Sequence, residues 1–237
     1  EKSIGMFAFS LWDRSTRTLS LVRDRMGEKP LYWAQFGSLI LFGSELKALQ
    51  AHPAWRGEID RGSLALLLRY GYITAPHSIF REARKIPPGT ILSFSSITPE
   101  PHLIQYWNIQ EVASHGMNKP LYKNQKDWVD TLEVELRRTL KREMIADVPI
   151  GAFLSGGVDS STVVALMQQE STKSVRTFSI GFHEQAFNEA QYAKAVAAYL
   201  GTEHTEFYVS SDEAMSIIPR LAYTYDEPFA DSSQIPT

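Results

Sequence analysis

The 237-residue sequence contains no cysteine, no long apolar run and no marked excess of either charge. Without cysteine, these residues can form no disulfide and no thiolate zinc site, and they contain no thiol nucleophile. A chain of this length can bury a core without such cross-links, and its length predicts one or two domains. The apolar runs, such as residues 64–68 and 163–167, are far shorter than the roughly 20 residues of a membrane-spanning helix.

The charge balance argues against polyanionic partners. Lys and Arg number 24 and Asp and Glu number 27, which gives a net charge of −3 with no block of one sign. Nucleic acids and anionic membranes are bound by basic patches, so we expect neither as a partner. The first residues lack a signal-peptide pattern, which predicts a cytoplasmic protein. Position 1 is Glu rather than Met, so we also expect the chain to be a piece of a longer protein.

The first half of the sequence has the pattern of an antiparallel sheet. Residues 6–45 contain short alternating strands separated by tight turns, and strands joined in this way pair antiparallel. A helix is predicted over 60–70, with Asp60 as its cap and Gly71 as its end. Further strands follow, and we therefore predict an α+β domain over residues 1–107.

The second half has a different pattern. Residues 108–126 are polar, contain Gly and Pro and lack periodicity, which predicts a linker. Asp127 is predicted to cap the helix that follows. From residue 150 onward, apolar strands alternate with helices, as in a parallel sheet covered by helices. We therefore predict an α/β domain over residues 127–237.

The run SGGVDSS at residues 155–161 carries recognisable chemistry, because it lies between a predicted strand and a predicted helix. Ligands of open α/β sheets bind beyond the carboxyl ends of the strands. Paired glycines let backbone N–H groups approach an anion, and the helix and the serine hydroxyls add positive charge and donors. Asp159 would repel a phosphate unless a cation lay between them, so the run predicts a pyrophosphate site with Mg²⁺.

The run differs from two common phosphate-binding motifs. It is not a Walker loop, because Gly157 stands where the lysine belongs, and it is not a G-x-G-x-x-G dinucleotide motif. The alternative is a glycine turn whose serines only cap the following helix.

The run resembles the pyrophosphate loop of the ATP pyrophosphatases, the adenylating α/β domains of GMP, NAD and asparagine synthetases. Further segments resemble the glutaminase and synthetase domains of glutamine-hydrolysing asparagine synthetases, and they follow that family's order along nearly the whole chain. These segments are residues 5–9, 23–32, 43–49, 84–89, 147–149 and 226–233.

The resemblance implies two incomplete domains. The first is part of an antiparallel sandwich of the N-terminal-nucleophile hydrolase type, and the second is part of a parallel adenine-nucleotide-hydrolase-like domain. The implied enzyme is a ligase with ATP, aspartate and glutamine as substrates. Its cysteine frees ammonia from glutamine, MgATP converts aspartate to β-aspartyl-AMP, and ammonia displaces AMP to give asparagine. That cysteine is expected upstream of Glu1, so we expect no catalytic residue within the chain and an inactive fragment. The resemblance is compatible with a homodimer.

The resemblance assigns site residues by position. The pyrophosphate would be held by Ser155, Gly156, Gly157, Ser160 and Ser161, with Asp159 as the Mg²⁺ ligand. Leu154, Ile180 and Gly181, at the ends of two strands, would contact the rest of ATP; the alternative is that Leu154 and Ile180 are plain strand core. Asp226 and Asp231 are candidates for a substrate contact or a second metal. Equally, Pro228 marks a turn there, and Asp231 with Ser232 would cap a helix.

Two other functions remain open. The chain could belong to a related amidotransferase, or to a β-lactam or lasso-peptide lactam synthetase, that activates another carboxylate. It could also be a nucleotide-binding module that has lost catalysis.

Overall fold

The computed structural model describes residues 3–95, 100–119, 124–183, 188–231 and 234. The chain divides into two compact units, one formed by residues 1–120 and 220–234 and the other by residues 121–219 and 235–237.

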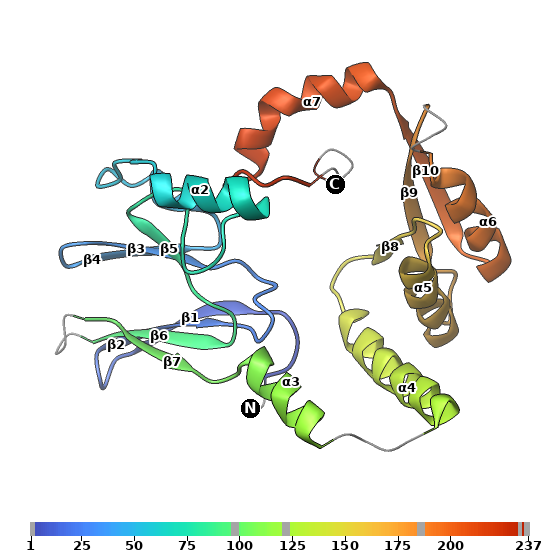
Figure 1. Ribbon diagram of the computed structural model, residues 1–237, viewed down its shortest axis with the longest axis horizontal. Helices are drawn as coiled ribbons and strands as arrows, with labels where there is room; N and C mark the ends of the chain where they lie inside the picture. Colours follow the sequence, from blue (N-terminus) through green and yellow to red (C-terminus); the bar gives the residue numbers. More distant parts are fainter. Residues whose placement is uncertain (1–2, 96–99, 120–123, 184–187, 232–233, 235–237) are drawn as a thin grey trace. The chain divides into compact units, whose positions relative to one another are not determined.

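The first unit contains two antiparallel sheets, drawn as separate layers in Figure 1. Its strands are β1 (Ala8–Asp13), β2 (Thr18–Arg23), β3 (Tyr32–Phe36), β4 (Leu39–Gly43), β5 (Ala83–Lys85), β6 (Thr90–Ser95) and β7 (His102–Gln105). One sheet has the order β1-β2-β6-β7 and the other the order β4-β3-β5. The predicted antiparallel pairing is confirmed, whereas the N-terminal-nucleophile type of the fold stays a prediction.

Apolar side chains fill the space between the two sheets. Leu21 of β2 lies opposite Leu92 of β6, and both are almost fully buried. Trp33 of β3 packs against the same cluster, with its ring 5.3 Å from that of Phe94. Each such side chain contributes about 1.5–3 kcal/mol when it is removed from water. The alternating residues of strands from both sheets therefore build one core.

A second apolar cluster joins the β4-β3-β5 sheet to the short helix α1 (Leu46–Gln50). Tyr32 and Ala34 of β3 pack there with Leu46, Leu49 and residues of the segment before β5. Helix α2 (Arg61–Tyr70) follows, and the Asp60 carboxylate accepts from the N–H of Gly62 at 2.8 Å. Gly71 ends the helix at a φ of +78°, so both predicted ends are confirmed.

The turn between β2 and β3 is held together by two charged residues. Asp24, 1% exposed, accepts from the N–H groups of Phe7, Glu28 and Lys29. Burial raises the pKa of Asp24, but these N–H groups outweigh it and hold the pKa below its usual range. The Arg23 guanidinium donates to three carbonyls, including that of Ile86 at 2.6 Å. Asp24 and Arg23 thus fix the turn through hydrogen bonds to the backbone on both sides.

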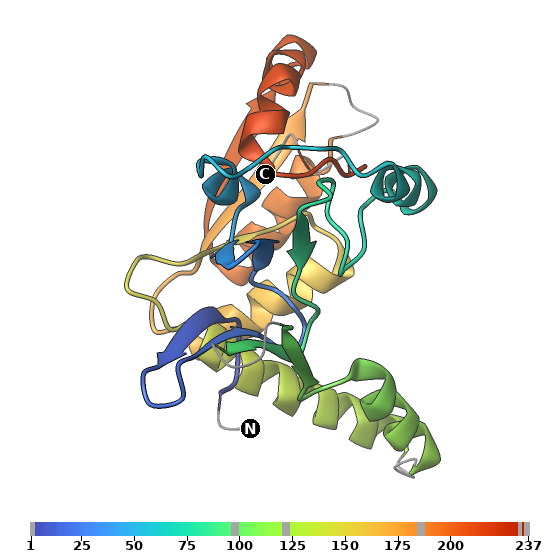
Figure 2. The same ribbon diagram turned by 90° about the vertical axis from the view of Figure 1, so that its left-hand side faces the viewer.

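The predicted linker contains a helix, and this corrects the expectation that its residues lack periodic structure. Helix α3 (Ile109–Asn118) begins where the Asn108 side chain accepts from the N–H of Gln110 at 2.8 Å. It follows β7 at the margin of the first unit (Figure 2). None of its residues is buried, although Ile109, Val112 and Met117 have the spacing of an apolar helix face.

The second unit contains a parallel sheet, as predicted. Its strands are β8 (Gly151–Phe153), β9 (Arg176–Phe182) and β10 (Glu203–Val209), in the order β10-β9-β8. The connecting helices are α5 (Val158–Glu170) and α6 (Ala190–Leu200). Val164 of α5 and Ala193 of α6 pack around the buried Leu154. The adenine-nucleotide-hydrolase-like type of this domain stays a prediction.

Helix α4 (Gln125–Glu143) begins earlier than predicted. Asn124 is its cap and accepts from the N–H of Asp127 at 2.9 Å, so Asp127 lies inside the first turn. Glu133 and Arg137, four residues apart on this helix, form an ion pair at 2.7 Å. Arg137 also pairs with Glu170 at 2.9 Å, which fastens α4 to α5.

Helix α7 (Ser211–Thr224) follows β10, and Ser210 and Glu213 form a reciprocal cap at its start. The division between the two units falls inside this helix, after Pro219. Residues 220–234 thus join the first unit, although the predicted second domain includes them. The predicted boundaries at 107 and 127 stay a prediction. Within the described part of the chain, none of the helices combines the length and apolar character needed to cross a membrane.

Candidate functional site

The predicted anion-binding loop lies at the carboxyl end of β8. Leu154, 2% exposed, donates its N–H to the carbonyl of Phe178 at 2.8 Å, which extends the parallel pairing by one residue. Its side chain lies in the core with Val164, as the alternative interpretation expected. The chain then turns through residues 155–157 into α5, whose N-cap is Gly157. This strand, loop and helix can be followed from β8 to α5 in Figure 1.

Gly156 brings the loop close to helix α6. Its φ is +77°, in the left-handed region that favours glycine. A Cβ atom at this position would lie 2.6 Å from the Cβ of Tyr192 and 2.8 Å from the backbone nitrogen of Ala193. The loop conformation therefore requires glycine for two reasons, the backbone angle and the space.

Two of the predicted serines meet across the loop. Ser155 Oγ and Ser160 Oγ lie 2.9 Å apart, and the N–H of Gly157 donates to Ser155 Oγ at 3.3 Å. Ser160 Oγ also lies 3.3 Å from the carbonyl oxygen of Gly157. These hydroxyls are held on the loop, where they can donate to a bound anion by rotating their hydrogens.

Ser161 lies in the first turn of α5 with an unsatisfied hydroxyl. Its Oγ is buried and has no hydrogen-bond partner among the described residues, and such a group costs about 1–3 kcal/mol. Within the same residues, no side chain caps α5. A helix start without a side-chain cap is suited to an anion. The arrangement therefore fits a phosphate better than a simple capped turn.

Asp159 lies exposed in the first turn of α5. Across the described ranges, no group of three or more His, Asp or Glu side chains could hold a metal ion by itself. Mg²⁺, however, is commonly bound through one or two carboxylates together with substrate phosphates and water. A single carboxylate beside an anion loop therefore fits Mg²⁺ that arrives with a nucleotide.

Ile180 and Gly181 lie at the same edge of the sheet as the loop. Phe153 pairs with Phe178, and β9 continues through Ile180 and Gly181 beyond the end of β8. A Cβ at Gly181 would lie 2.7 Å from the Tyr208 ring and 3.0 Å from the Ala190 Cβ. Gly181 thus makes room for a neighbouring strand and helix.

Asp226 and Asp231 belong to the first unit, whereas the loop belongs to the second. The Asp226 carboxylate accepts from the N–H of Leu46, at the start of α1, and lies 3.7 Å from the Lys47 amine. The Asp231 carbonyl accepts from the N–H of Gln234 at 3.3 Å. Ser232, the expected helix-capping partner, lies outside the described residues.

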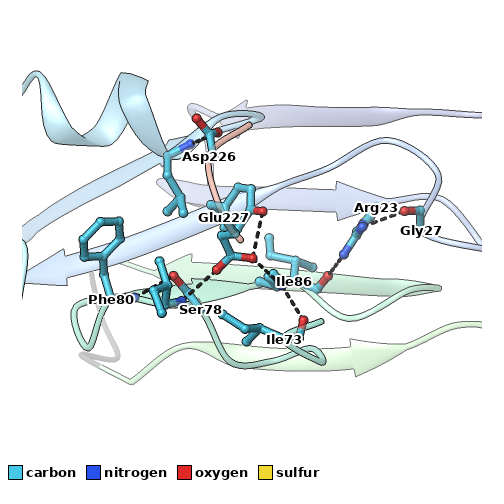
Figure 3. Close-up of polar contacts among 12 residues, drawn as sticks. Arg23, Gly27, Ile73, Ser78, Phe80, Ile86, Asp226 and Glu227 are labelled. Carbon is cyan, nitrogen blue, oxygen red and sulfur yellow. Dashed lines mark hydrogen bonds and ion pairs between the residues drawn. The ribbon is translucent and has the colours of Figure 1, made fainter. Parts of the chain in front are cut away.

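Glu227 is a polar residue that the sequence did not single out. Its side chain is 9% exposed, pairs with the Lys85 amine at 2.5 Å and accepts from the N–H of Ile79 at 2.7 Å (Figure 3). Tyr32 Oη lies 3.4 Å from the same carboxylate. Burial, and then the charges of Glu227 and Asp226, raise the pKa of Tyr32. The acidic pair before Pro228 was the only local signal, because Lys85 is far away in the sequence.

Comparisons with known proteins assign a family model to each half of the chain. Residues 1–107 match the family model of the glutamine amidotransferase domain, and residues 131–237 match that of asparagine synthase. The chain therefore joins an amidotransferase part to a synthase part. With the relatives described next, these matches show that it belongs to the family of glutamine-hydrolysing asparagine synthetases.

The curated relatives are longer than this chain. It is 35% identical to "Putative asparagine synthetase [glutamine-hydrolyzing] 2" of Methanocaldococcus jannaschii, over 98% of this chain and 44% of the relative. It is 33% identical to "Asparagine synthetase [glutamine-hydrolyzing] 1" of Bacillus subtilis, over 98% of this chain and 35% of the relative. "Amidase chyE" of Penicillium rubens is 27% identical over 84% of this chain. The chain thus spans less than half the length of these relatives.

Proposed function

We propose that the chain is part of a cytoplasmic, ATP-dependent asparagine synthetase, which makes asparagine from aspartate and glutamine through β-aspartyl-AMP. Family membership supports the overall reaction. The observation that carries the nucleotide part is the loop at residues 155–161. There, a glycine with positive φ, paired serines, an orphaned hydroxyl and a helix start without a side-chain cap lie beyond one strand of a parallel sheet.

In this proposal, the loop holds the pyrophosphate portion of ATP. The N–H groups of Gly156 and Gly157 and the first turn of α5 bind the phosphate oxygens, and the hydroxyls of Ser155, Ser160 and Ser161 donate to them. Asp159 holds Mg²⁺, which neutralises charge on the phosphates. Ile180, with Leu154 and Gly181, borders the adenosine at the same edge of the sheet.

The chemistry explains why such a loop is useful. A carboxylate is a poor acyl donor, so an oxygen of the aspartate side chain first attacks the α-phosphorus of ATP and pyrophosphate leaves. The leaving pyrophosphate gains charge as that bond breaks, and preorganised N–H donors stabilise this charge without rearranging. Ammonia then attacks the acyl carbon and AMP leaves, which yields asparagine.

The test is calorimetric titration of the 237-residue chain with MgATP. We expect binding that weakens about tenfold or more in Asp159→Asn, because the carboxylate no longer holds the metal. Asp212→Asn is the matched control, since Asp212 is also an acidic residue in a helix first turn of the second unit. Equal affinities in the chain, Asp159→Asn and Asp212→Asn would contradict the metal role, and no binding at all would contradict the nucleotide site.

The acceptor is tested separately in the full-length protein, by exchange of labelled pyrophosphate into ATP. Aspartate is expected to support exchange, because adenylation is reversible while pyrophosphate is present. Exchange with another carboxylic acid but not with aspartate would favour a related amidotransferase or a lactam synthetase. Exchange with no acid would indicate an inactive nucleotide-binding module.

A further inference from the structure

Residues 223–230, here called the strap, belong to one half of the chain by family match and to the other by structure. It lies within the residues matched by the asparagine synthase model, yet it belongs to the first compact unit together with the amidotransferase match. Its first two residues are the last two of α7, the helix that begins after β10 in the second unit. At the strap, the chain therefore returns from the second unit to the unit that contains the amidotransferase match.

Polar contacts anchor both ends of the strap. The Lys47 amine donates to the carbonyl of Tyr223 at 3.1 Å, and the Asp226 carboxylate accepts from the N–H of Leu46. Beyond these, the N–H of Ala230 donates to the carbonyl of Gly71 at 2.6 Å. These partners belong to α1 and to the end of α2, so the strap spans two elements of the first unit.

Glu227 forms the buried centre of the strap. Lys85 on β5 is 15% exposed, and its amine contacts the Glu227 carboxylate and the carbonyl of Ile73, each at 2.5 Å (Figure 3). The other carboxylate oxygen accepts from the N–H of Ile79. Both charges are thus paired and hydrogen-bonded. Removing either partner would leave the other buried without compensation, which is strongly unfavourable.

The strap covers a cavity instead of completing the core. A cavity of about 300 Å³ lies under it, lined by Tyr32, Glu45, Lys85 and the strap itself. Among the described residues, no strap residue belongs to an apolar cluster of the first unit. Polar contacts therefore hold the strap, and neither apolar cluster depends on its side chains.

Helix α7 contains a point at which it can bend. Pro219 lies inside the helix, and the division between the two units falls directly after it. Proline has no N–H to donate to the preceding turn, so the helix is weakened there. The helix before Pro219 belongs to the second unit, and the part after it continues into the strap.

We propose that the strap is a latch. Glu227, through its ion pair with Lys85, is the residue that positions it, and α7 bends at Pro219. The latch fastens the chain that leaves the nucleotide-binding half to the amidotransferase half. Its catalytic consequence rests on the proposed function. Ammonia freed in one half reaches the other at high effective concentration only while the halves are fastened, whereas ammonia supplied in solution does not need the latch.

The latch itself is tested by amide hydrogen exchange in the 237-residue chain. In Glu227→Gln and Lys85→Met, we expect the Ile79 amide and residues 223–230 to exchange on the order of a hundredfold faster, because a buried charge loses its partner. The β1 and β2 amides should keep their rates. Glu58→Gln, which removes the exposed ion pair with Arg81, is the control and should change neither set.

A double variant distinguishes loss of the ion pair from a general failure to fold. Lys85→Met combined with Glu227→Gln leaves no unpaired charge, so its strap should exchange more slowly than in either single variant. Unchanged exchange of the strap in Glu227→Gln, or a double variant as fast as the product of the two single effects, overturns the latch.

The catalytic consequence is tested in the full-length protein, as the ratio of glutamine-dependent to ammonia-dependent asparagine formation. Glu227→Gln should lower this ratio about tenfold or more, because only transferred ammonia depends on effective concentration. Equal loss of both activities would indicate a merely structural role and overturn the assignment. If the unmodified full-length protein makes asparagine from neither nitrogen source, the proposed function is overturned. The hydrogen-exchange experiment would still decide whether the latch exists.

Discussion

Replacing Gly156 by alanine should destabilise the second unit more than any comparable change in the loop. The new Cβ would meet the Cβ of Tyr192 at 2.6 Å and the backbone nitrogen of Ala193 at 2.8 Å. Overpacking of this kind costs about 1–3 kcal/mol, and a left-handed φ costs a residue with a Cβ about 1–2 kcal/mol. Because the obstacle is partly backbone, trimming Tyr192 to alanine should not relieve it. The expected loss is therefore about 2–5 kcal/mol.

The assay is urea unfolding followed by circular dichroism, with amide exchange of β9 used to assign the transition to the second unit. A loss of this size lowers the melting temperature of a unit of about 100 residues by about 10 °C or more. Gly157→Ala is the matched control, because its φ is −73° and its Cβ would meet only Ser155 Oγ, at 3.3 Å. If Gly156→Ala and Gly157→Ala unfold at the same urea concentration, the close approach of loop and helix is refuted.

Two further predictions concern the first unit. Burial and the carboxylates of Glu227 and Asp226 raise the pKa of Tyr32. Above a pH of about 10, the Tyr32 hydroxyl therefore stays protonated in the folded chain, whereas in the unfolded chain it loses its proton. The free energy of unfolding should therefore fall as the pH rises past 10. In Tyr32→Phe, the urea midpoint should fall less between pH 8 and pH 10.5 than in the unmodified chain. An equal fall in both proteins would exclude Tyr32 as the source. The purified 237-residue chain should release no ammonia from glutamine, because it has no thiol nucleophile; release above the level of a heat-denatured sample would contradict this.

Much of the fold could be predicted because its signals are local. Alternating strands with short turns specify antiparallel pairing, and Asp60 with Gly71 marks both ends of α2. The start of α4 was misplaced because Asn124 and Asp127 are both good caps with an acidic residue three positions later, and only the structure decides between them. Helix α3 was missed because Gly116 and the polar residues around it suggested a linker, although Ile109, Val112 and Met117 have helical spacing.

The candidate site divides in the same way. The loop at residues 155–161 is contiguous, so its glycines and serines could be recognised together. Its contact with α6 could not be, because Tyr192 and Ala193 approach Gly156 only through the packing of a helix after the next strand. Glu227 was missed for a related reason. Its partners on and near β5 are more than a hundred residues away, and no local pattern connects them.

The strap has a consequence for dissecting this protein. The amidotransferase match ends at residue 107, so residues 1–107 look like a natural unit to express alone. That piece would keep Lys85 but lose Glu227, leaving a half-buried ammonium ion and an open cavity beside Tyr32. The family match therefore leaves out the residue that pairs with Lys85. An isolated amidotransferase part of this chain would regain this ion pair only with residues 220–230 supplied as a fusion or as a separate peptide.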